Sequence, residues 1–192
     1  MDPRSRRAAR LALTLLLTVY GVACLRTPGE FRLVDFINLP IHETGHLLFA
    51  PFGEFMQALG GTLFQLIMPA AFVGYFLKRG DRHAASVALW WIGENCWNIA
   101  VYVADARAQE LPLVGGGEHD WTYLLGEMGW LMRDAEVARA VHVAGVVIFA
   151  LATVGGVLAA LQEPPAGAAD EAYRADEAHR ADRPPLTHPA HG

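Results

Sequence analysis

The chain has 192 residues, 53% of them hydrophobic and 18% charged, with a formal net charge of −5. The length suits a single domain, and the apolar residues form long blocks between short charged breaks, which is typical of a polytopic membrane protein. The sequence has no stripe of lysine and arginine with interleaved aromatic residues, so it gives no support to nucleic-acid binding. Cys24 and Cys96 lie in apolar segments, which favours buried thiols over a disulfide framework or a zinc knuckle.

The first membrane segment is predicted over residues 11–25, an apolar run that follows four arginines. A cleaved signal peptide would have a similar pattern. Because further membrane segments follow, we favour an uncleaved first span with a cytoplasmic N-terminus.

Residues 42–46 are His-Glu-Thr-Gly-His, the HExxH pattern, within an apolar stretch. On a helix, His42 and His46 lie one turn apart on one face, so both can bind a single metal ion. Glu43 then lies beside the ion, where it could take a proton from water. Asn38 is predicted to cap this helix, with Pro40 in its first turn. Paired histidines are often ordinary surface or core residues, but ionisable groups at membrane depth tend to mark function.

Residues 37–77 are apolar almost throughout, yet five prolines and glycines interrupt them: Pro51, Gly53, Gly60, Gly61 and Pro69. A spanning helix needs about 20 residues, so this stretch could form two thin crossings, or one broken re-entrant helix and one crossing. The predicted fold is therefore an all-α membrane bundle of four to five spans.

Residues 84–104 form the next predicted span. Glu94, Asn98 and Asp105 share one face of it, which predicts a polar stripe toward the bundle interior, lining a cavity. The alternative is that these groups only hydrogen-bond neighbouring helices.

Beyond this span, residues 106–120 are predicted to be an exposed connection with a glycine run. Asp120 is predicted to cap an amphipathic segment over 121–132, and residues 137–161 form the last span. The domain then covers residues 1–161, and residues 162–192, rich in alanine, proline and charge, are predicted to be a disordered tail.

The positive-inside rule places both the N-terminal arginines and a second basic cluster, Lys78, Arg79 and Arg82, in the cytoplasm. An even number of crossings must then separate the two clusters. This favours four crossings, with a re-entrant HExxH helix and both termini in the cytoplasm. The membrane is predicted to be a bacterial-type inner (plasma) membrane. With five crossings, His42 and His119 would lie near opposite faces of the membrane, separated by most of its thickness of about 30 Å.

A catalytic zinc ion (Zn2+) usually takes three protein ligands and keeps one open position. The candidates for the third ligand are His119, Asp120 and Asp105. His119 is slightly favoured because it is a good ligand type in a glycine-rich loop, whereas Asp120 also suits a helix cap and Asp105 could orient a histidine from outside the ligand set.

The chain resembles the site-2 protease-like intramembrane zinc metalloproteases over residues 37–125, with a motif that is specific only at HExxH. The resemblance rests on this motif in an apolar helix, on Gly60 and Gly61 after it, and on a later segment with Gln65 and Pro69. In that family the third ligand is an aspartate in a Leu-Asp-Gly motif. Residues 119–121 here are His-Asp-Trp, similar in position but without the glycine, so the resemblance implies Asp120 as the ligand.

The resemblance implies hydrolysis of peptide bonds in or near the bilayer, with a membrane protein or peptide as substrate. Zinc would lower the pKa of its bound water, Glu43 would move the proton to the leaving amine, and Asn98 or Asn95 would stabilise the oxyanion. Two other functions suit the same residues: hydrolysis of lipid amides or esters, and a non-catalytic membrane scaffold. Transport is less favoured because the chain lacks repeated halves.

Overall fold

The computed structural model describes residues 2–112 and 118–162, and within these ranges every regular element is helical. In chain order the elements are α1 (Pro3–Arg26), α2 (Asp35–Phe49), η1 (Ala50–Phe52), α3 (Glu54–Lys78), α4 (Arg82–Ala104), α5 (Asp120–Glu127), η2 (Leu131–Arg133) and α6 (Asp134–Leu161). The all-α prediction is confirmed. The predicted disordered tail lies outside the described residues, apart from Gln162.

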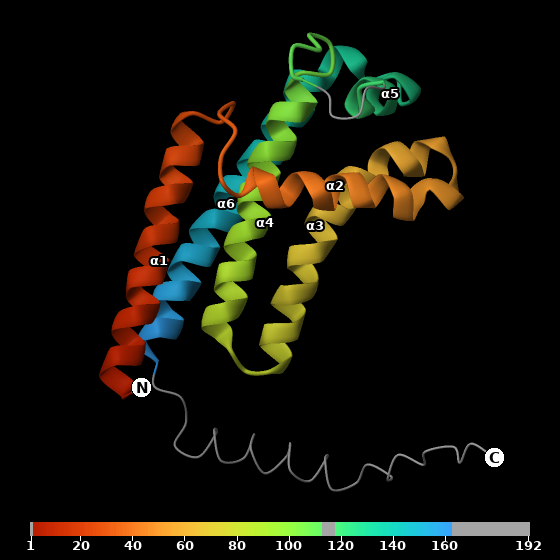
Figure 1. Ribbon diagram of the computed structural model, residues 1–192. Coiled ribbons are helices and arrows are strands. Elements are labelled where there is room, and N and C mark those ends of the chain that lie inside the picture. Colours follow the sequence, from red (N-terminus) through yellow and green to blue (C-terminus); the bar gives the residue numbers. More distant parts are fainter. Residues whose placement is uncertain (1, 113–117, 163–192) are drawn as a thin grey trace, which may run out of the picture. The chain divides into compact units, whose positions relative to one another are not determined.

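Four long helices, α1, α3, α4 and α6, run side by side, and α2 runs across them toward one end (Figure 1). Helix α4 is in the middle and packs against α1, α3 and α6. Side-chain caps begin two of these helices: Asp2 accepts a hydrogen bond from the Ser5 N–H at 2.9 Å, and Asp81 accepts one from the Ala84 N–H at 3.0 Å.

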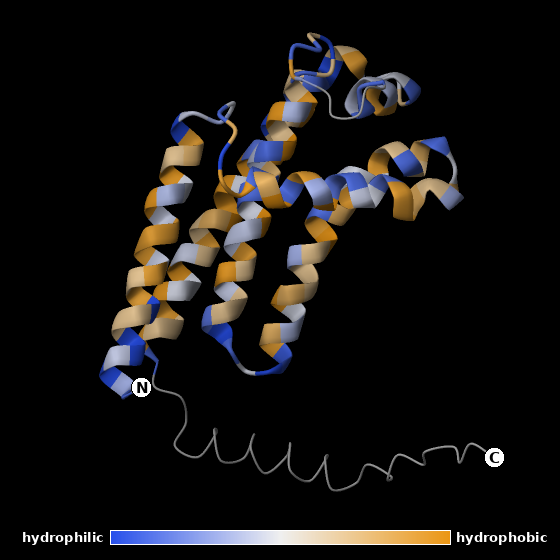
Figure 2. Cartoon of the chain, viewed as in Figure 1, coloured by the Kyte–Doolittle hydropathy of each residue, from blue (hydrophilic) through white to orange (hydrophobic). Residues whose placement is uncertain are grey.

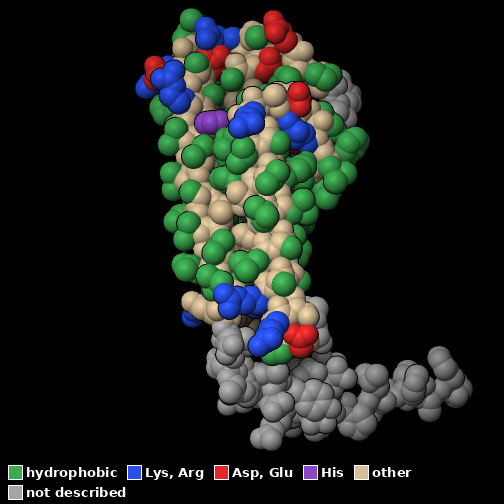
Figure 3. Space-filling model, turned by 90° about the vertical axis from the view of Figure 1, so that its left-hand side faces the viewer, with side chains coloured by type: hydrophobic (Ala, Val, Ile, Leu, Met, Phe, Trp, Pro, Cys, Tyr) green, Lys and Arg blue, Asp and Glu red, His purple; other side chains and the backbone are tan. Residues whose placement is uncertain are grey.

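In the described part of the chain, three helical stretches are long and apolar enough to cross a membrane: α1, α3 and Leu131–Leu161. Hydrophobic residues fill the middle of these helices and hydrophilic residues gather toward their ends (Figure 2). On the face that includes α1, a band of hydrophobic side chains separates the charged side chains at the two ends (Figure 3). These features fit an integral membrane protein and agree with the first and last predicted spans.

Helix α4 coincides with the predicted span 84–104, but it is too polar to count among those three stretches. More than half of its residues are buried, Glu94 and Asn95 among them. Because neighbouring helices surround α4, it does not have to present an apolar surface, and its polar side chains hydrogen-bond within the bundle.

The predicted start of the HExxH helix is wrong. Helix α2 begins at Asp35, so Asn38 and Pro40 lie inside it and Asn38 caps nothing. The Asn38 side chain is buried instead, where its Nδ2 donates to Glu94 at 2.8 Å and its Oδ1 accepts from Trp91 at 2.8 Å. These partners on α4 hold Asn38 inside the helix, although its type favours a cap.

Of the predicted interruptions, Pro51 lies in η1 directly after α2, and Gly53 separates η1 from α3. Gly53 has φ = 97°, a left-handed conformation that favours glycine, and here the chain turns from η1 into α3. Gly60, Gly61 and Pro69 lie inside α3. The first of these glycines serves the crossing of α2 and α3, since a Cβ on Gly60 would lie 2.6 Å from the carbonyl oxygen of Gly45.

The two basic clusters lie at the same end of the helices. The Arg10 guanidinium near the start of α1 is 3.6 Å from the Asp81 carboxylate in the turn between α3 and α4. Cys24 and Cys96 are buried and unpaired, as predicted.

We predict that Gly60→Ala destabilises the protein by about 1–3 kcal/mol, because a methyl group there forces α2 and α3 apart. Thermal unfolding in detergent, followed by circular dichroism, measures the effect. The matched control is Gly74→Ala on the same helix, where a Cβ meets no other atom within 4 Å. Equal unfolding temperatures for the two variants would contradict the close crossing.

Candidate metal centre

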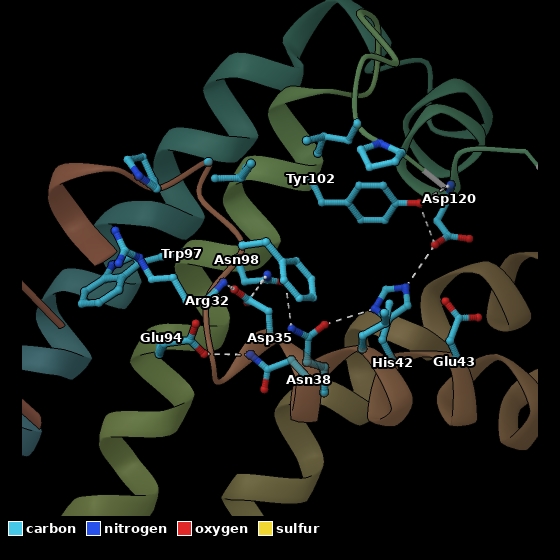
Figure 4. Close-up of a pocket in the computed structure, with 18 of the residues that line it drawn as sticks. Arg32, Asp35, Asn38, His42, Glu43, Glu94, Trp97, Asn98, Tyr102 and Asp120 are labelled. Atoms are coloured by element: carbon cyan, nitrogen blue, oxygen red, sulfur yellow. Dashed lines mark hydrogen bonds and ion pairs between the residues drawn. The ribbon is translucent and has the colours of Figure 1, made fainter. Parts of the chain in front are cut away.

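Three potential metal ligands converge where α2 meets the start of α5. The Nε2 atoms of His42 and His46 each lie 3.3 Å from the Oδ2 of Asp120 (Figure 4 shows His42 and Asp120). All three ligand atoms lie within 4.8 Å of one another, and theirs is the one such group of histidine, cysteine and acidic residues in the described ranges. The predicted pairing of His42 and His46 is the helical one: their ring centroids are 4.7 Å apart.

The Nδ1 atom of each imidazole faces a hydrogen-bond acceptor. His42 Nδ1 lies 3.1 Å from the side-chain oxygen of Gln65, and His46 Nδ1 lies 2.8 Å from the backbone carbonyl oxygen of Gln57. Because an oxygen of this kind only accepts, both Nδ1 atoms carry the proton. The Nε2 atoms are then the ones left for an ion, which would displace any proton that they share with Asp120.

The polar face of α4 fixes the orientation of Gln65. Asn95 donates to the backbone carbonyl of Gln65 at 3.1 Å, so the Asn95 side-chain oxygen must point back and accept from Gln65 Nε2 at 2.7 Å. Asn98 also accepts from Gln65 Nε2, at 3.0 Å, while its own Nδ2 donates to Asp35 at 2.9 Å. With its amide nitrogen held in this way, Gln65 presents its oxygen to His42.

Asp120 is the first residue of α5, and its Oδ2 accepts a hydrogen bond from the Tyr102 hydroxyl at 3.1 Å. Burial works to raise the pKa of Asp120, but hydrogen bonds from His42 and His46 outweigh it and hold this pKa below its usual value. The hydrogen bond to Asp120 likewise raises the pKa of His46 to about 9. The Asp120 carboxylate thus stabilises positive charge, a proton or a metal ion, at the point where the three groups meet.

Glu43 lies next to His42 on the cavity side of α2 (Figure 4). No described residue donates a hydrogen bond to its carboxylate or pairs with it. The carboxylate is therefore free to contact a water molecule or a substrate.

His119 and Asp105 lie outside the three-residue group. The His119 side chain is fully buried: its Nδ1 accepts from the Thr122 N–H at 3.3 Å, and its ring lies 4.2 Å from that of Tyr102. Its Nε2 lies 3.4 Å from Asp105, whose carboxylate accepts the backbone N–H groups of residues 110 and 111. His119, and not Asp120, is the cap of α5, so the predicted cap was one residue too late.

The group opens into a cavity of about 940 Å³. It is lined by α2, α4, the start of α5 and the loop before α2, and Asn98 and Tyr102 lie in its wall. Asn98 was predicted from the polar stripe, whereas the roles of Gln57 and Tyr102 were missed. Nothing local in the sequence marks Gln57, which takes part through its backbone, but Tyr102 lies one turn beyond Asn98 on the same face of α4.

Two imidazole nitrogens and one carboxylate oxygen are a donor set that suits zinc, and three protein ligands leave a coordination position open. The acceptors behind both imidazoles support this fit. Comparison with known proteins adds no family: no protein-family model, curated protein or solved structure matches the chain.

We predict that detergent-purified protein binds about one zinc ion per chain. Zinc content, measured by mass spectrometry, should fall in His42→Ala and Asp120→Ala. It should persist in Asp105→Asn and in His119→Asn, which keeps a good helix cap. Loss of zinc in His119→Asn together with full zinc in Asp120→Ala would identify His119 as the third ligand instead.

Proposed function

We propose that this protein is a membrane-embedded zinc metalloprotease of the site-2 protease-like type, which hydrolyses peptide bonds in or near the bilayer. The observation that supports it best is the convergence of His42, His46 and Asp120 on one point of a cavity wall that also carries Glu43. A group that could hold a metal ion, and beside it a carboxylate that no described residue pairs with, are the two parts that this chemistry needs.

The zinc ion would be held by His42 Nε2, His46 Nε2 and a carboxylate oxygen of Asp120. When bound, it supplies Lewis-acid chemistry, which acidifies a water molecule and polarises a carbonyl group. Gln65 and Tyr102 hold the ligands in place from behind, so that the protein loses little entropy on binding the ion.

Glu43 acts as the general base and then as the general acid. Its carboxylate takes a proton from the attacking water and transfers it to the leaving amine nitrogen as the peptide bond breaks. Asn98 is suited to the oxygen of the substrate carbonyl: the hydrogen bonds of the described residues use one of its two N–H groups, and the other is available for that oxygen.

We predict that Glu43→Gln lowers the rate of hydrolysis of a transmembrane reporter peptide about 10²–10⁴-fold while zinc stays bound, because only the proton acceptor is removed. Glu127→Gln, the same change at an exposed site outside the cavity, should leave the rate unchanged. Undiminished hydrolysis by the Glu43→Gln variant would rule out this mechanism. Extracted membrane lipids, assayed in parallel, test the lipid amide or ester hydrolase that the same groups could form.

For the membrane topology, we infer four crossings by α1, α3, α4 and α6, with α2 re-entrant and both termini cytoplasmic in a bacterial-type inner membrane. The side-by-side arrangement of the four helices supports it, as does the contact of Arg10 with Asp81, which brings the two basic clusters to one side. The metal centre then lies toward the opposite, outer side.

This topology predicts that a cysteine at position 29 reacts with an impermeant maleimide added to intact cells, whereas one at position 79 reacts only after permeabilisation. Gly29→Cys is suited because a Cβ there meets no atom within 4 Å, and the buried Cys24 and Cys96 keep the background low. If both positions were labelled from the same side, the stretch between them would not cross the membrane an odd number of times.

A further inference from the structure

The cavity continues past the metal centre to a second group of polar residues. Asp35 and Asn38 lie on α2, on the cavity side with His42, and they face Glu94 and Asn98 of α4 (Figure 4). The proposed hydrolysis mechanism gives Asp35 and Glu94 no role.

Glu94 is only 5% exposed, yet its carboxylate is incompletely partnered. One oxygen accepts from Asn38 Nδ2 at 2.8 Å, and the other accepts no hydrogen bond from the described residues. No lysine, arginine or histidine among them pairs with it. Burying such a group without a counterion is costly, so a positive charge that enters the cavity is attracted to it.

Asp35 is buried in the same way, and no ion pair joins it to a described residue, although the positive charge of Arg32 acts on it through space. Its two oxygens accept from Asn98 Nδ2 at 2.9 Å and from the backbone N–H of Arg32 at 2.6 Å. The Arg32 guanidinium is directed elsewhere: it pairs with Glu30 at 2.9 Å and donates to the backbone carbonyl of Ala23 at 3.3 Å.

The cavity as a whole is acidic. Seven carboxyl side chains line it among the described residues, against the guanidinium of Arg32, which pairs with Glu30, and the imidazole of His46, which pairs with Asp120. A divalent ion at the metal centre offsets only part of this excess. A cavity lined by one sign of charge concentrates ligands of the opposite sign.

We propose that Asp35 and Glu94 form a subsite for the cationic group of the substrate, the ammonium of a lysine or the guanidinium of an arginine side chain. This inference rests on the proposed protease function and specifies its substrate. The ammonium and the guanidinium each carry several N–H donors and no acceptor. They therefore match two carboxylates that asparagine side chains hold in position.

The spacing along α2 gives the position of the basic residue. Asp35 precedes His42 by two helical turns, roughly 10 Å along the axis. An extended peptide advances about 3.3 Å per residue. The lysine or arginine therefore lies within about three residues of the bond that is cleaved.

The experiment measures peptide binding to the full-length, zinc-loaded Glu43→Gln variant in detergent. Two otherwise identical peptides carry either lysine or norleucine, its uncharged counterpart, at successive positions near the scissile bond. We expect the lysine peptide to bind about 10- to 100-fold more tightly at one position. Adding Glu94→Gln, or separately Asp35→Asn, should abolish this preference and leave the affinity for the norleucine peptide unchanged.

The matched control is Glu54→Gln, a cavity carboxylate outside this subsite, which should keep the preference for lysine. Equal affinity for the two peptides at every position would overturn the proposal, and so would a preference that survives either Glu94→Gln or Asp35→Asn. Hydrolysis by the wild-type protein is measured separately. A lysine preference in binding without any hydrolysis would keep the subsite and reject the protease function.

Discussion

The site depends on the close crossing of α2 and α3. Because Gly45 and Gly60 have no side chains, the two backbones come close enough for both histidines of α2 to reach acceptors on α3. Gly61 contributes in a different way: a Cβ there would lie 2.5 Å from His42 Nε2, so its hydrogen leaves room for the imidazole. Three glycines thus set the position of the ligands. The close approach of α2 and α3 that they permit determines both the packing of the helices and the geometry of the site.

A second constraint is that polar groups inside a bundle of apolar helices must find hydrogen-bond partners. Helix α4 satisfies it by directing its asparagines to Gln65 and Asp35 while α1, α3 and α6 cover its remaining surface. The hydrogen bonds that satisfy the buried polar side chains of α4 also orient His42. Stability and ligand geometry therefore come from one network, and a substitution at Asn95 would disturb both.

Local patterns predicted the features that depend on local geometry. Two of these features follow from helical periodicity: the four-residue spacing of His42 and His46 and the polar face of α4. A third follows from length, the apolar runs of α1 and α6. All are present in the structure. What these patterns did not provide depends on tertiary partners. Asn38 has the type of a cap but is held inside α2 by Glu94 and Trp91, and the path of the chain after α4 decides that Asp120, and not His119, lies beside the histidines. Spacing in the sequence contains neither fact.

Hydrolysis of a peptide in a bilayer requires water and an unwound backbone where hydrocarbon supplies no hydrogen bonds. A cavity of about 940 Å³ with amides, a phenol and carboxylates in its wall can supply partners for the freed backbone groups. For the proposed hydrolysis, the cavity would also have to hold the unwound segment in register with Glu43. A basic side chain bound between Asp35 and Glu94 would do this, since its charge offsets the buried carboxylates while its backbone is positioned along α2. The acidity of the cavity would then be a means of holding substrate as well as metal.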